Sequence, residues 1–323
     1  MKRVAIALLG CGTVGSGFVE LVERERSRIR SRFAVDLRIT SILVRDLGKP
    51  RPPVDPRLLT TSAIEAIDAG ADVVVELIGG VHSAGAYVRR ALRHGAHVVT
   101  ANKALLATSG SALLSLAAEQ GVSIGFEASV CGCIPIVQVL REGLAGDAIE
   151  ALGGVVNGTC NYILTRMEQG AGFEEALREA QQRGFAEADP SLDLDGTDAA
   201  QKMTILGQIA FGETVVRSRV RGIDALSAAD IRSAQHRGAA LRLVARAERV
   251  PGGVAIDVAP RELPAGHPFA SVAAEENAVM IRGRAIGELL LRGKGAGAMP
   301  TAAAVLSDVL GTVRGRAGIP TAA

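Results

Sequence analysis

A glycine-rich loop between an apolar strand and a helix constrains the fold of this chain more than any other sequence feature. The run RVAIALL leads into GCGTVG, whose glycines have G-x-G-x-x-G spacing, and a helical pattern follows over 14–30. The first glycine allows a tight turn, the second lets a pyrophosphate approach the backbone, and the third lets helix and strand pack closely. The N–H groups that open the helix favour an anion. The predicted coenzyme-binding residues of this loop are Gly10, Gly12, Thr13, Val14 and Gly15.

The residues after the second predicted strand bear on which coenzyme this loop would hold. Arg45 and Asp46 stand where the adenosine ribose is expected, with Lys49 nearby. An acidic residue there prefers a free 2′-hydroxyl, whereas a basic residue accepts a 2′-phosphate. Because both types are present, NAD and NADP stay open, with NADP favoured and Arg45 as a predicted contact. The alternatives are a solvated turn at Lys49 and, at the glycines, a tight turn without a ligand.

The pattern of apolar runs divides the chain into two parts. In the first 130 residues, runs such as DVVVELIGG and HVVTA alternate with helical patterns, which indicates a parallel sheet covered on both faces. Beyond about residue 135, helices stand next to antiparallel strand signals, including the hairpin AALRLVARAERV-PGG-VAIDVAP. We predict a Rossmann-type doubly wound α/β domain over 1–135, which binds a dinucleotide, and a second α+β domain over 136–294.

Composition argues against several classes of function. The formal net charge is only +2 and no domain is strongly basic, which disfavours a nucleic-acid partner. No apolar run reaches the about eighteen residues of a membrane span, and MKRVAIALLG lacks a signal-peptide cleavage region. The four cysteines are too few and too irregular for a disulfide framework. We therefore expect a cytoplasmic protein that binds neither membranes nor nucleic acids.

An acidic cluster followed by one lysine lies in GFAEADPSLDLDGTDAAQKMTILG, residues 184–207. Read as a calcium loop, SLDLDG would put Asp193 and Asp195 at ligand positions and Lys202 where a bidentate glutamate is needed. Because a lysine cannot ligate calcium, we exclude this interpretation. We exclude zinc as well, since Cys131-x-Cys133 has no second cysteine pair and no histidine at zinc spacing.

The same stretch is better explained as a site for a cationic substrate. A helix beginning near Thr197 would place Asp198 and Lys202 one turn apart on one face. An exposed ion pair is the commonest meaning of this spacing, but the apolar run MTILGQIAF that follows indicates a largely buried helix. Glu187, on the preceding loop, could bind an ammonium group, while Asp198 and Lys202 handle a hydroxyl proton.

Lysines are rare in this chain, which makes Lys103 a second candidate. Most of the 36 basic residues are arginines, which cannot lose their proton in a protein, whereas a lysine can. Lys103 follows a predicted strand in VVTANKALLA, and ligands of open α/β sheets bind beyond the carboxyl ends of the strands. A solvent-exposed lysine at a helix start is the alternative.

Seven stretches, spread over nearly the whole chain, form a recognisable pattern. They are GCGTVG, DVVVELIGG, VVTANKALLA, FEASVCGCIPIV, VNGTCNYILTRM, GFAEADPSLDLDGTDAAQKMTILG and GAGAMPTAAAVLSD. In sequence and in order they resemble the homoserine dehydrogenases. The resemblance implies reversible conversion of L-homoserine to L-aspartate 4-semialdehyde with NADP or NAD, in the route to threonine and methionine. It also implies a homodimer formed through the second domain.

The resemblance assigns roles in substrate binding and proton transfer. Gly184, Glu187 and Asp198 would hold the amino acid, and Lys202 would transfer the proton. Lys103 would lie between the nicotinamide and the substrate, as a binding or a second proton-transfer group. If a lysine takes the hydroxyl proton, oxidation should be faster at alkaline pH, because the lysine must first be neutral.

The resemblance further implies coenzyme contacts at Gly79 and Gly297, so that the segment 295–323 returns its helix to the dinucleotide-binding domain. A structural sodium ion would lie near the domain junction. Its implied ligands are the side chain of Glu127 and the backbone carbonyls of Val130, Gly132 and Ile134.

The chain departs from the family's usual pattern in four places. Cys131 and Cys133 replace small residues at the implied cation site, RGKGAG, with Lys294, replaces a GPGAG-like turn, and Gln201 stands beside Lys202 where many members have histidine. The chain also ends after its final helix, so feedback by threonine through a C-terminal regulatory domain is not expected.

Two other functions are considered: a related oxidoreductase with a different amino acid, and a nucleotide sensor. The sensor would need the glycine loop but neither Glu187, Asp198 nor the lysines.

Overall fold

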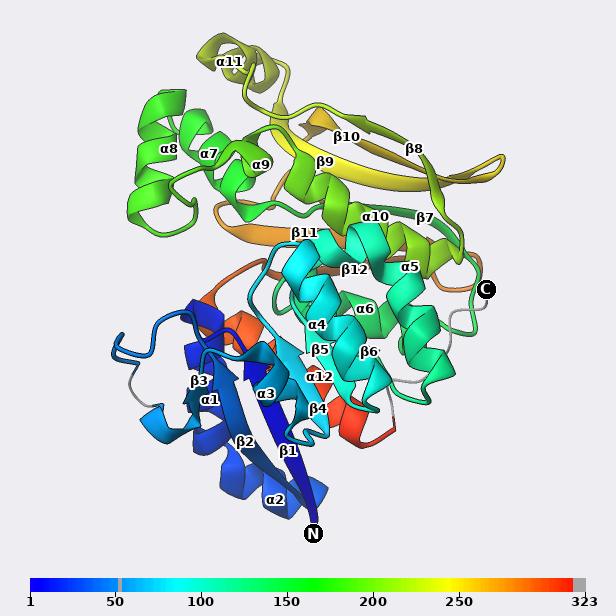
Figure 1. The fold of residues 1–323 in the computed structure, drawn as a ribbon. Coiled ribbons are helices and arrows are strands. Elements are labelled where there is room, and N and C mark those ends of the chain that lie inside the picture. Colours follow the sequence, from blue (N-terminus) through cyan, green and yellow to red (C-terminus); the bar gives the residue numbers. More distant parts are fainter. Residues whose placement is uncertain (52–53, 316–323) are drawn as a thin grey trace. The chain divides into compact units, whose positions relative to one another are not determined.

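The computed structural model describes residues 1–51 and 54–315 and divides into two compact units (Figure 1). The first unit contains Met1–Cys133 and the described residues from Gly297 onward, and the second contains Ile134–Ala296. Each unit has its own six-stranded sheet. The last helix of the chain therefore belongs to the same unit as the N-terminal strands.

The sheet of the first unit is parallel throughout, with the strand order β3-β2-β1-β4-β5-β6. This order belongs to the doubly wound dinucleotide-binding fold and confirms the predicted fold class. Ile6, Leu8, Val73 and Val75 are fully buried because helices cover both faces of the sheet. The strands are β1 (Lys2–Leu9), β2 (Val35–Leu43), β3 (Leu59–Thr60), β4 (Val73–Glu76), β5 (His97–Thr100) and β6 (Ile124–Gly125).

The helices of the first unit largely follow the predicted alternation with strands, but the first predicted helix differs. The single helix predicted over 14–30 is two helices, which are separated at Glu25. Of the residues in the second helix, only Ile29 is buried. The helical segments are α1 (Thr13–Arg24), α2 (Arg26–Phe33), η1 (Pro56–Leu58), α3 (Ala63–Asp68), α4 (His82–Arg93), α5 (Lys103–Glu119), η2 (Glu127–Ser129) and α12 (Ala298–Val313).

Helix α12 packs against α1 within the first unit. A Cβ atom on Gly17 of α1 would lie 3.4 Å from the sulfur of Met299 and 3.5 Å from Cβ of Ala302, so this glycine permits a close helix approach. Val305 and Val309 of α12 are fully buried in the core that β1 and α1 also line. The core of the first unit is thus made from both ends of the described chain.

Asp36 in β2 gives the first unit a pH-dependent contribution to stability. Its carboxylate is buried and accepts hydrogen bonds from Arg38 at 2.9 Å and Arg30 at 2.8 Å. Although burial raises the pKa of Asp36, the hydrogen bonds from Arg38 and Arg30 lower it to about 2. Because this value lies below the 3.8 of an unperturbed aspartate, the carboxylate stabilises the fold above that pH. The contribution is lost as pH falls through the folded-state pKa.

We expect Asp36→Asn to lower the urea midpoint of unfolding at about pH 6 and to have a much smaller effect at about pH 2, where Asp36 is about half protonated in the folded protein. The measurement is the difference in midpoint between the two proteins at each pH. A difference that stays constant from about pH 6 to about pH 2 would contradict an electrostatic role.

The sheet of the second unit has the order β12-β11-β7-β9-β10-β8. The predicted hairpin is confirmed as β9 and β10, which turn between Val250 and Gly253. All neighbouring strands of this sheet are antiparallel except β8 and β10 at one edge, which are parallel. In the chain, α11 and β9 connect β8 to β10 and allow this parallel pairing. The strands are β7 (Ile149–Val155), β8 (Val215–Val220), β9 (Ala239–Val250), β10 (Gly253–Pro264), β11 (Glu276–Gly283) and β12 (Gly287–Lys294).

Helix α10 lies on this sheet and begins at Thr197, as the sequence predicts. Gly207 lets it approach closely, since a Cβ there would be 3.1 Å from Cβ of Ala247 in β9. Among the described residues, no helix is both long enough and apolar enough to span a membrane. The helical segments are α6 (Ile136–Gln138), the π-helical η3 (Val139–Gly143), α7 (Gly158–Glu168), α8 (Phe173–Gln182), α9 (Ser191–Leu194), α10 (Thr197–Phe211) and α11 (Ala228–His236).

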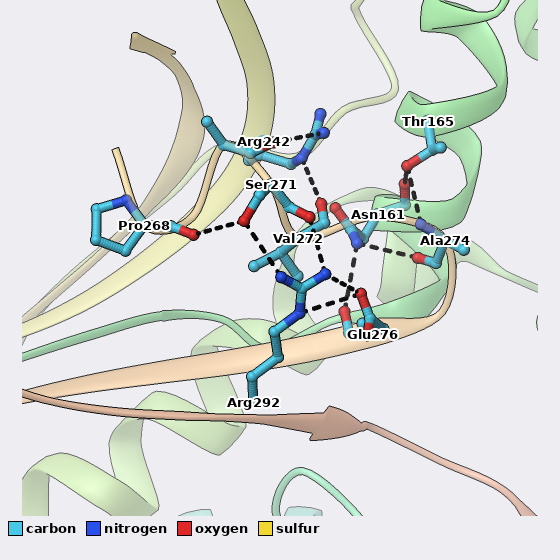
Figure 2. Close-up of polar contacts among 10 residues, drawn as sticks. Asn161, Thr165, Arg242, Pro268, Ser271, Val272, Ala274, Glu276 and Arg292 are labelled. Carbon is cyan, nitrogen blue, oxygen red and sulfur yellow. Dashed lines mark hydrogen bonds and ion pairs between the residues drawn. The ribbon is translucent and has the colours of Figure 1, made fainter. Parts of the chain in front are cut away.

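The segment 265–275, between β10 and β11, has no regular structure but is held by side chains from three other elements (Figure 2). Phe269 and Val272 anchor it in a small apolar cluster. It therefore enters β11 in a fixed position, which places Asn277 beside the residues described below. Three side chains donate hydrogen bonds to backbone carbonyls here. Arg242 binds the carbonyls of Ala270 and Val272, Arg292 binds that of Ser271, and Asn161 binds those of Ala274 and Glu276.

Candidate active site

The glycine loop of the first unit has the geometry that its spacing predicts. Gly10 has φ of 102°, and a Cβ there would lie 2.7 Å from the carbonyl oxygen of Leu77. A Cβ on Gly15 would lie 2.3 Å from the Gly10 carbonyl oxygen, whereas one on Gly12 would meet nothing within 4 Å. Gly10 and Gly15 are therefore required for close packing, and Gly12 leaves the backbone open to a ligand.

Helix α1 begins directly after this loop and presents its N-terminal turn to the same space. Thr13 and Val14 are its first two residues, and the N-cap residue Gly12 supplies no side-chain cap. Orphan N–H groups at a helix start, together with the helix dipole, favour a phosphate. The residues present thus fit the pyrophosphate of a dinucleotide.

The residues predicted to meet the adenosine ribose follow β2 on the surface. Arg45, Asp46 and Lys49 are all exposed. The Asp46 carboxylate accepts a hydrogen bond from the Gly48 N–H at 2.8 Å, and Arg51 donates to the Asp46 and Lys49 carbonyls. Asp46 thus has a role in its own turn, while Arg45 is exposed two residues after the end of β2.

Two further predicted residues lie at the carboxyl edge of the parallel sheet. Gly79, with φ of 71°, is in the turn after β4. Lys103 is half-buried and is the first residue of α5, which follows β5 and is capped by the side chain of Asn102. Gly297 has φ of 136° and is the N-cap residue of α12 in the same unit.

Asp198 and Lys202 form a largely buried ion pair in the second unit. The Lys202 ammonium lies 2.7 Å from Oδ2 of Asp198, and the two side chains are 13% and 7% exposed. Lys202 also donates to the Val156 carbonyl at 2.9 Å, and Asn277 donates to the same carbonyl at 3.1 Å. The alternative interpretation from the sequence, an exposed surface ion pair, is therefore wrong.

Asn157 contacts the predicted site residue Asp198, although spacing did not reveal it. Its Nδ2 donates to Oδ2 of Asp198 at 2.8 Å and to Oδ1 of Asp193 at 2.7 Å, while its Oδ1 accepts from the Cys160 N–H and caps α7. The amide thus fixes two carboxylates at the N-terminal end of one helix. The only available signal was its place in NGTCNYIL, which entered the family resemblance without a role.

Cys160 lies beneath this cluster, and its thiol donates to the Asp193 carbonyl at 3.0 Å. Burial raises the pKa of the Cys160 thiol well above its ordinary value, and the charges of Asp193 and Asp198 raise it further. The thiol is therefore protonated at neutral pH. It serves packing and hydrogen bonding in the fold.

The loop that carries Glu187 is exposed but tied down at its start. Gly184 has φ of 75° and ends the α8 region, and the next residue, Phe185, accepts a hydrogen bond through its carbonyl from the Thr159 hydroxyl at 2.6 Å. Glu187 itself is exposed, with its backbone carbonyl 3.3 Å from the Gln181 amide nitrogen. Its carboxylate is thus on the surface, unlike that of Asp198.

The residues predicted to hold a sodium ion are distributed between the units. Glu127 and Val130 are buried around η2, and Gly132 has φ of 55°. Ile134 belongs to the second unit, and its carbonyl accepts from the Ile136 N–H at 2.7 Å. One carboxylate with carbonyl oxygens is a donor set that suits a hard cation. Within the described residues, no group of three or more His, Cys, Asp or Glu side chains could hold a metal ion.

Comparison with known proteins identifies the family. The family model described as homoserine dehydrogenase matches residues 135–310, and that described as the homoserine dehydrogenase NAD-binding domain matches residues 10–127. The chain belongs to the homoserine dehydrogenase family. The predicted family and enzyme class, an oxidoreductase that uses a nicotinamide coenzyme, are thereby confirmed.

Individual homoserine dehydrogenases agree with this assignment. The chain is 43% identical to the enzyme of Bacillus subtilis, covering 97% of this chain and 74% of the relative. A Thiobacillus denitrificans structure of the family superposes with a TM-score of 0.93 at 41% identity, over 97% of this chain and 74% of that one. A hyperthermophilic archaeal homoserine dehydrogenase in complex with NADPH gives a TM-score of 0.83 at 31% identity, over 97% and 98% of the two chains.

Proposed function

We propose that this chain oxidises L-homoserine reversibly to L-aspartate 4-semialdehyde with NADP or NAD, using Lys202 as its principal proton-transfer group. Family membership over nearly the whole chain supports the reaction. The observation that supports Lys202 in this role is its largely buried ion pair with Asp198. Burial of two charged side chains is costly, so this pair is better explained by a function than by surface solvation. The substrate offers an ammonium, a carboxylate and a hydroxyl group to such a site.

The coenzyme would lie on the first unit. Gly10, Gly12, Thr13, Val14 and Gly15 would hold its pyrophosphate, with Gly79 and Gly297 as further contacts. A nicotinamide held there would supply the hydride acceptor for the carbon that bears the hydroxyl group. Arg45 would contact the adenosine ribose, and because its cationic side chain suits a 2′-phosphate, we propose NADP as the preferred coenzyme.

The amino acid would be bound by Gly184, Glu187 and Asp198. Glu187 would attract the ammonium group, and its exposure fits a carboxylate that meets substrate from solution. In oxidation Lys202, in its neutral form, takes the hydroxyl proton as hydride departs. Asn157 keeps Asp198 oriented toward Lys202 through the hydrogen bond at 2.8 Å. Lys103, at the start of α5, is proposed as a binding or second proton-transfer group.

A sodium ion, a homodimer and a cytoplasmic location complete the proposal. Glu127, with the carbonyls of Val130, Gly132 and Ile134, would supply the oxygen ligands of the ion. All four cysteines are free, which fits a reducing compartment. The dimer would form through the second unit, whose sheet has β12 and β8 at its edges.

We expect the protein to reduce NADP, and NAD more weakly, when L-homoserine is added, with a rate that rises from about pH 7 to about pH 10 because a neutral lysine must accept the proton. The absorbance of the reduced nicotinamide measures both. Reduction of neither coenzyme anywhere in this range would contradict the homoserine assignment, and other short amino acids would then be tested. A rate independent of pH would exclude a lysine as the base.

A further inference from the structure

Glu76, the last residue of β4, is a fully buried carboxylate that the proposed reaction does not use. Its Oε1 accepts hydrogen bonds from the backbone N–H groups of Ile78 at 2.9 Å and Gly79 at 3.0 Å. Its Oε2 accepts from the Thr100 hydroxyl at 2.6 Å. A carboxylate is costly to bury, and these three donors, all uncharged, offset that cost.

The hydrogen bonds of Glu76 continue into the start of α5. Thr100, at the end of β5, accepts from the Asn102 N–H at 3.0 Å. The Asn102 amide then donates to the Gly80 carbonyl at 2.6 Å and accepts from the Leu105 N–H at 3.1 Å, which caps the helix. Lys103 is the first residue of that helix. One network therefore fixes the turn after β4 and the backbone that carries Lys103.

The turn held by Glu76 lies against the glycine loop. Leu77, the residue after Glu76, donates its N–H to the Leu9 carbonyl at 2.7 Å, and its own carbonyl oxygen would be 2.7 Å from a Cβ on Gly10. Gly79 and Gly80 both have left-handed φ, and Cβ atoms on them would meet nothing within 4 Å. Glu76 therefore fixes the turn, whose two glycines leave space for a ligand. The turn lies at the carboxyl ends of β1 and β4, where the strand order of the sheet reverses and where such sheets bind ligands.

We propose that Glu76, with Thr100, is a positioning residue for coenzyme binding. It holds the Gly79–Gly80 turn and the start of α5 in the arrangement that receives the nicotinamide end of the coenzyme, without touching the coenzyme itself. The inference rests on the proposed function for the coenzyme, but it adds a role for a residue at which sequence spacing gave no signal.

The test removes one donor while keeping the shape of the side chain. Thr100→Val deletes the hydroxyl that binds Glu76, and Thr100→Ser restores it. We expect the dissociation constant for NADPH, measured by its fluorescence on binding, to rise about ten- to a hundredfold in Thr100→Val, since a hydrogen bond to a charged group is lost. The coenzyme KM should rise with it while the homoserine KM stays nearly unchanged, and Thr100→Ser should bring both coenzyme constants back to within about threefold. Glu76→Gln, which removes the charge, should weaken NADPH binding in the same direction.

Thr312→Val is the matched control. Thr312 is also buried in the first unit, but its hydroxyl donates to the Val309 carbonyl of its own helix at 2.8 Å. This variant should leave NADPH binding unchanged. If Thr100→Val lowers stability yet binds NADPH like the wild type, or if neither Thr100→Val nor Glu76→Gln folds, the network serves the fold alone and the inference is overturned. Failure of the wild type to bind NADPH would instead overturn the proposed function.

Discussion

Replacing Lys202 by alanine should lower kcat for homoserine oxidation about a hundred- to ten-thousandfold, the usual contribution of a positioned acid–base group. Lys202→Arg should be nearly as impaired, although it keeps a positive charge beside Asp198, because a guanidinium cannot give up its proton to become a base. Steady-state rates of coenzyme reduction measure both variants. NADPH affinity should be unchanged, since the glycine loop belongs to the other unit.

Lys2→Ala provides the control for the loss of a lysine as such. Lys2 is an exposed residue of β1, far in sequence from the acidic cluster, and its ammonium donates to the Val313 carbonyl at 3.4 Å. Its replacement should leave the rate unchanged. A Lys202→Arg enzyme that retained the wild-type rate within about threefold would show that Lys202 contributes charge and not proton transfer.

Arg242→Met should destabilise the second unit by about 3–5 kcal/mol, the cost of removing one partner of a buried ion pair. The Arg242 side chain is 3% exposed and lies 2.6 Å from the Glu168 carboxylate. Its guanidinium also donates to the Val272 carbonyl (Figure 2) and to the Ala270 carbonyl. The variant therefore leaves two carbonyls and a carboxylate without this donor. Methionine retains much of the volume, and the loss is therefore one of hydrogen bonds and charge. Urea unfolding at neutral pH measures it.

Arg237→Met is the matched control for this substitution. Arg237 pairs with Glu262 at 2.6 Å, but the two side chains are 54% and 43% exposed. Exposed pairs of this kind contribute about 1 kcal/mol or less, so the variant should unfold close to the wild type. Equal destabilisation by both substitutions would mean that burial does not set the contribution of Arg242.

The features that the sequence predicts are those whose physical requirements are local. Gly10 and Gly15 are recognisable because a turn and a close helix approach each need a glycine at a set spacing. Asp198 and Lys202 are recognisable because residues four apart share a helix face, and the apolar run after them indicates burial. These regularities also gave the doubly wound sheet and the β9–β10 hairpin.

The rest depends on partners that only the folded chain brings together. Asn157 binds Asp198 across 41 residues of sequence, and Glu76 binds Thr100 across 24. Such contacts form only when strands pair and helices pack, and the periodicity of the sequence does not predict them. The same holds for β8, whose parallel pairing with β10 follows from the path through α11 and β9 and not from its own residues.

The position of α12 has a consequence for how the chain acquires its structure during synthesis. The second unit is continuous in sequence, whereas the first needs α12 to cover Gly17 and Phe18 of α1. The strands of the first unit are therefore synthesised long before the helix that covers them, and the apolar surface of α1 stays uncovered until α12, the last described helix, has been made.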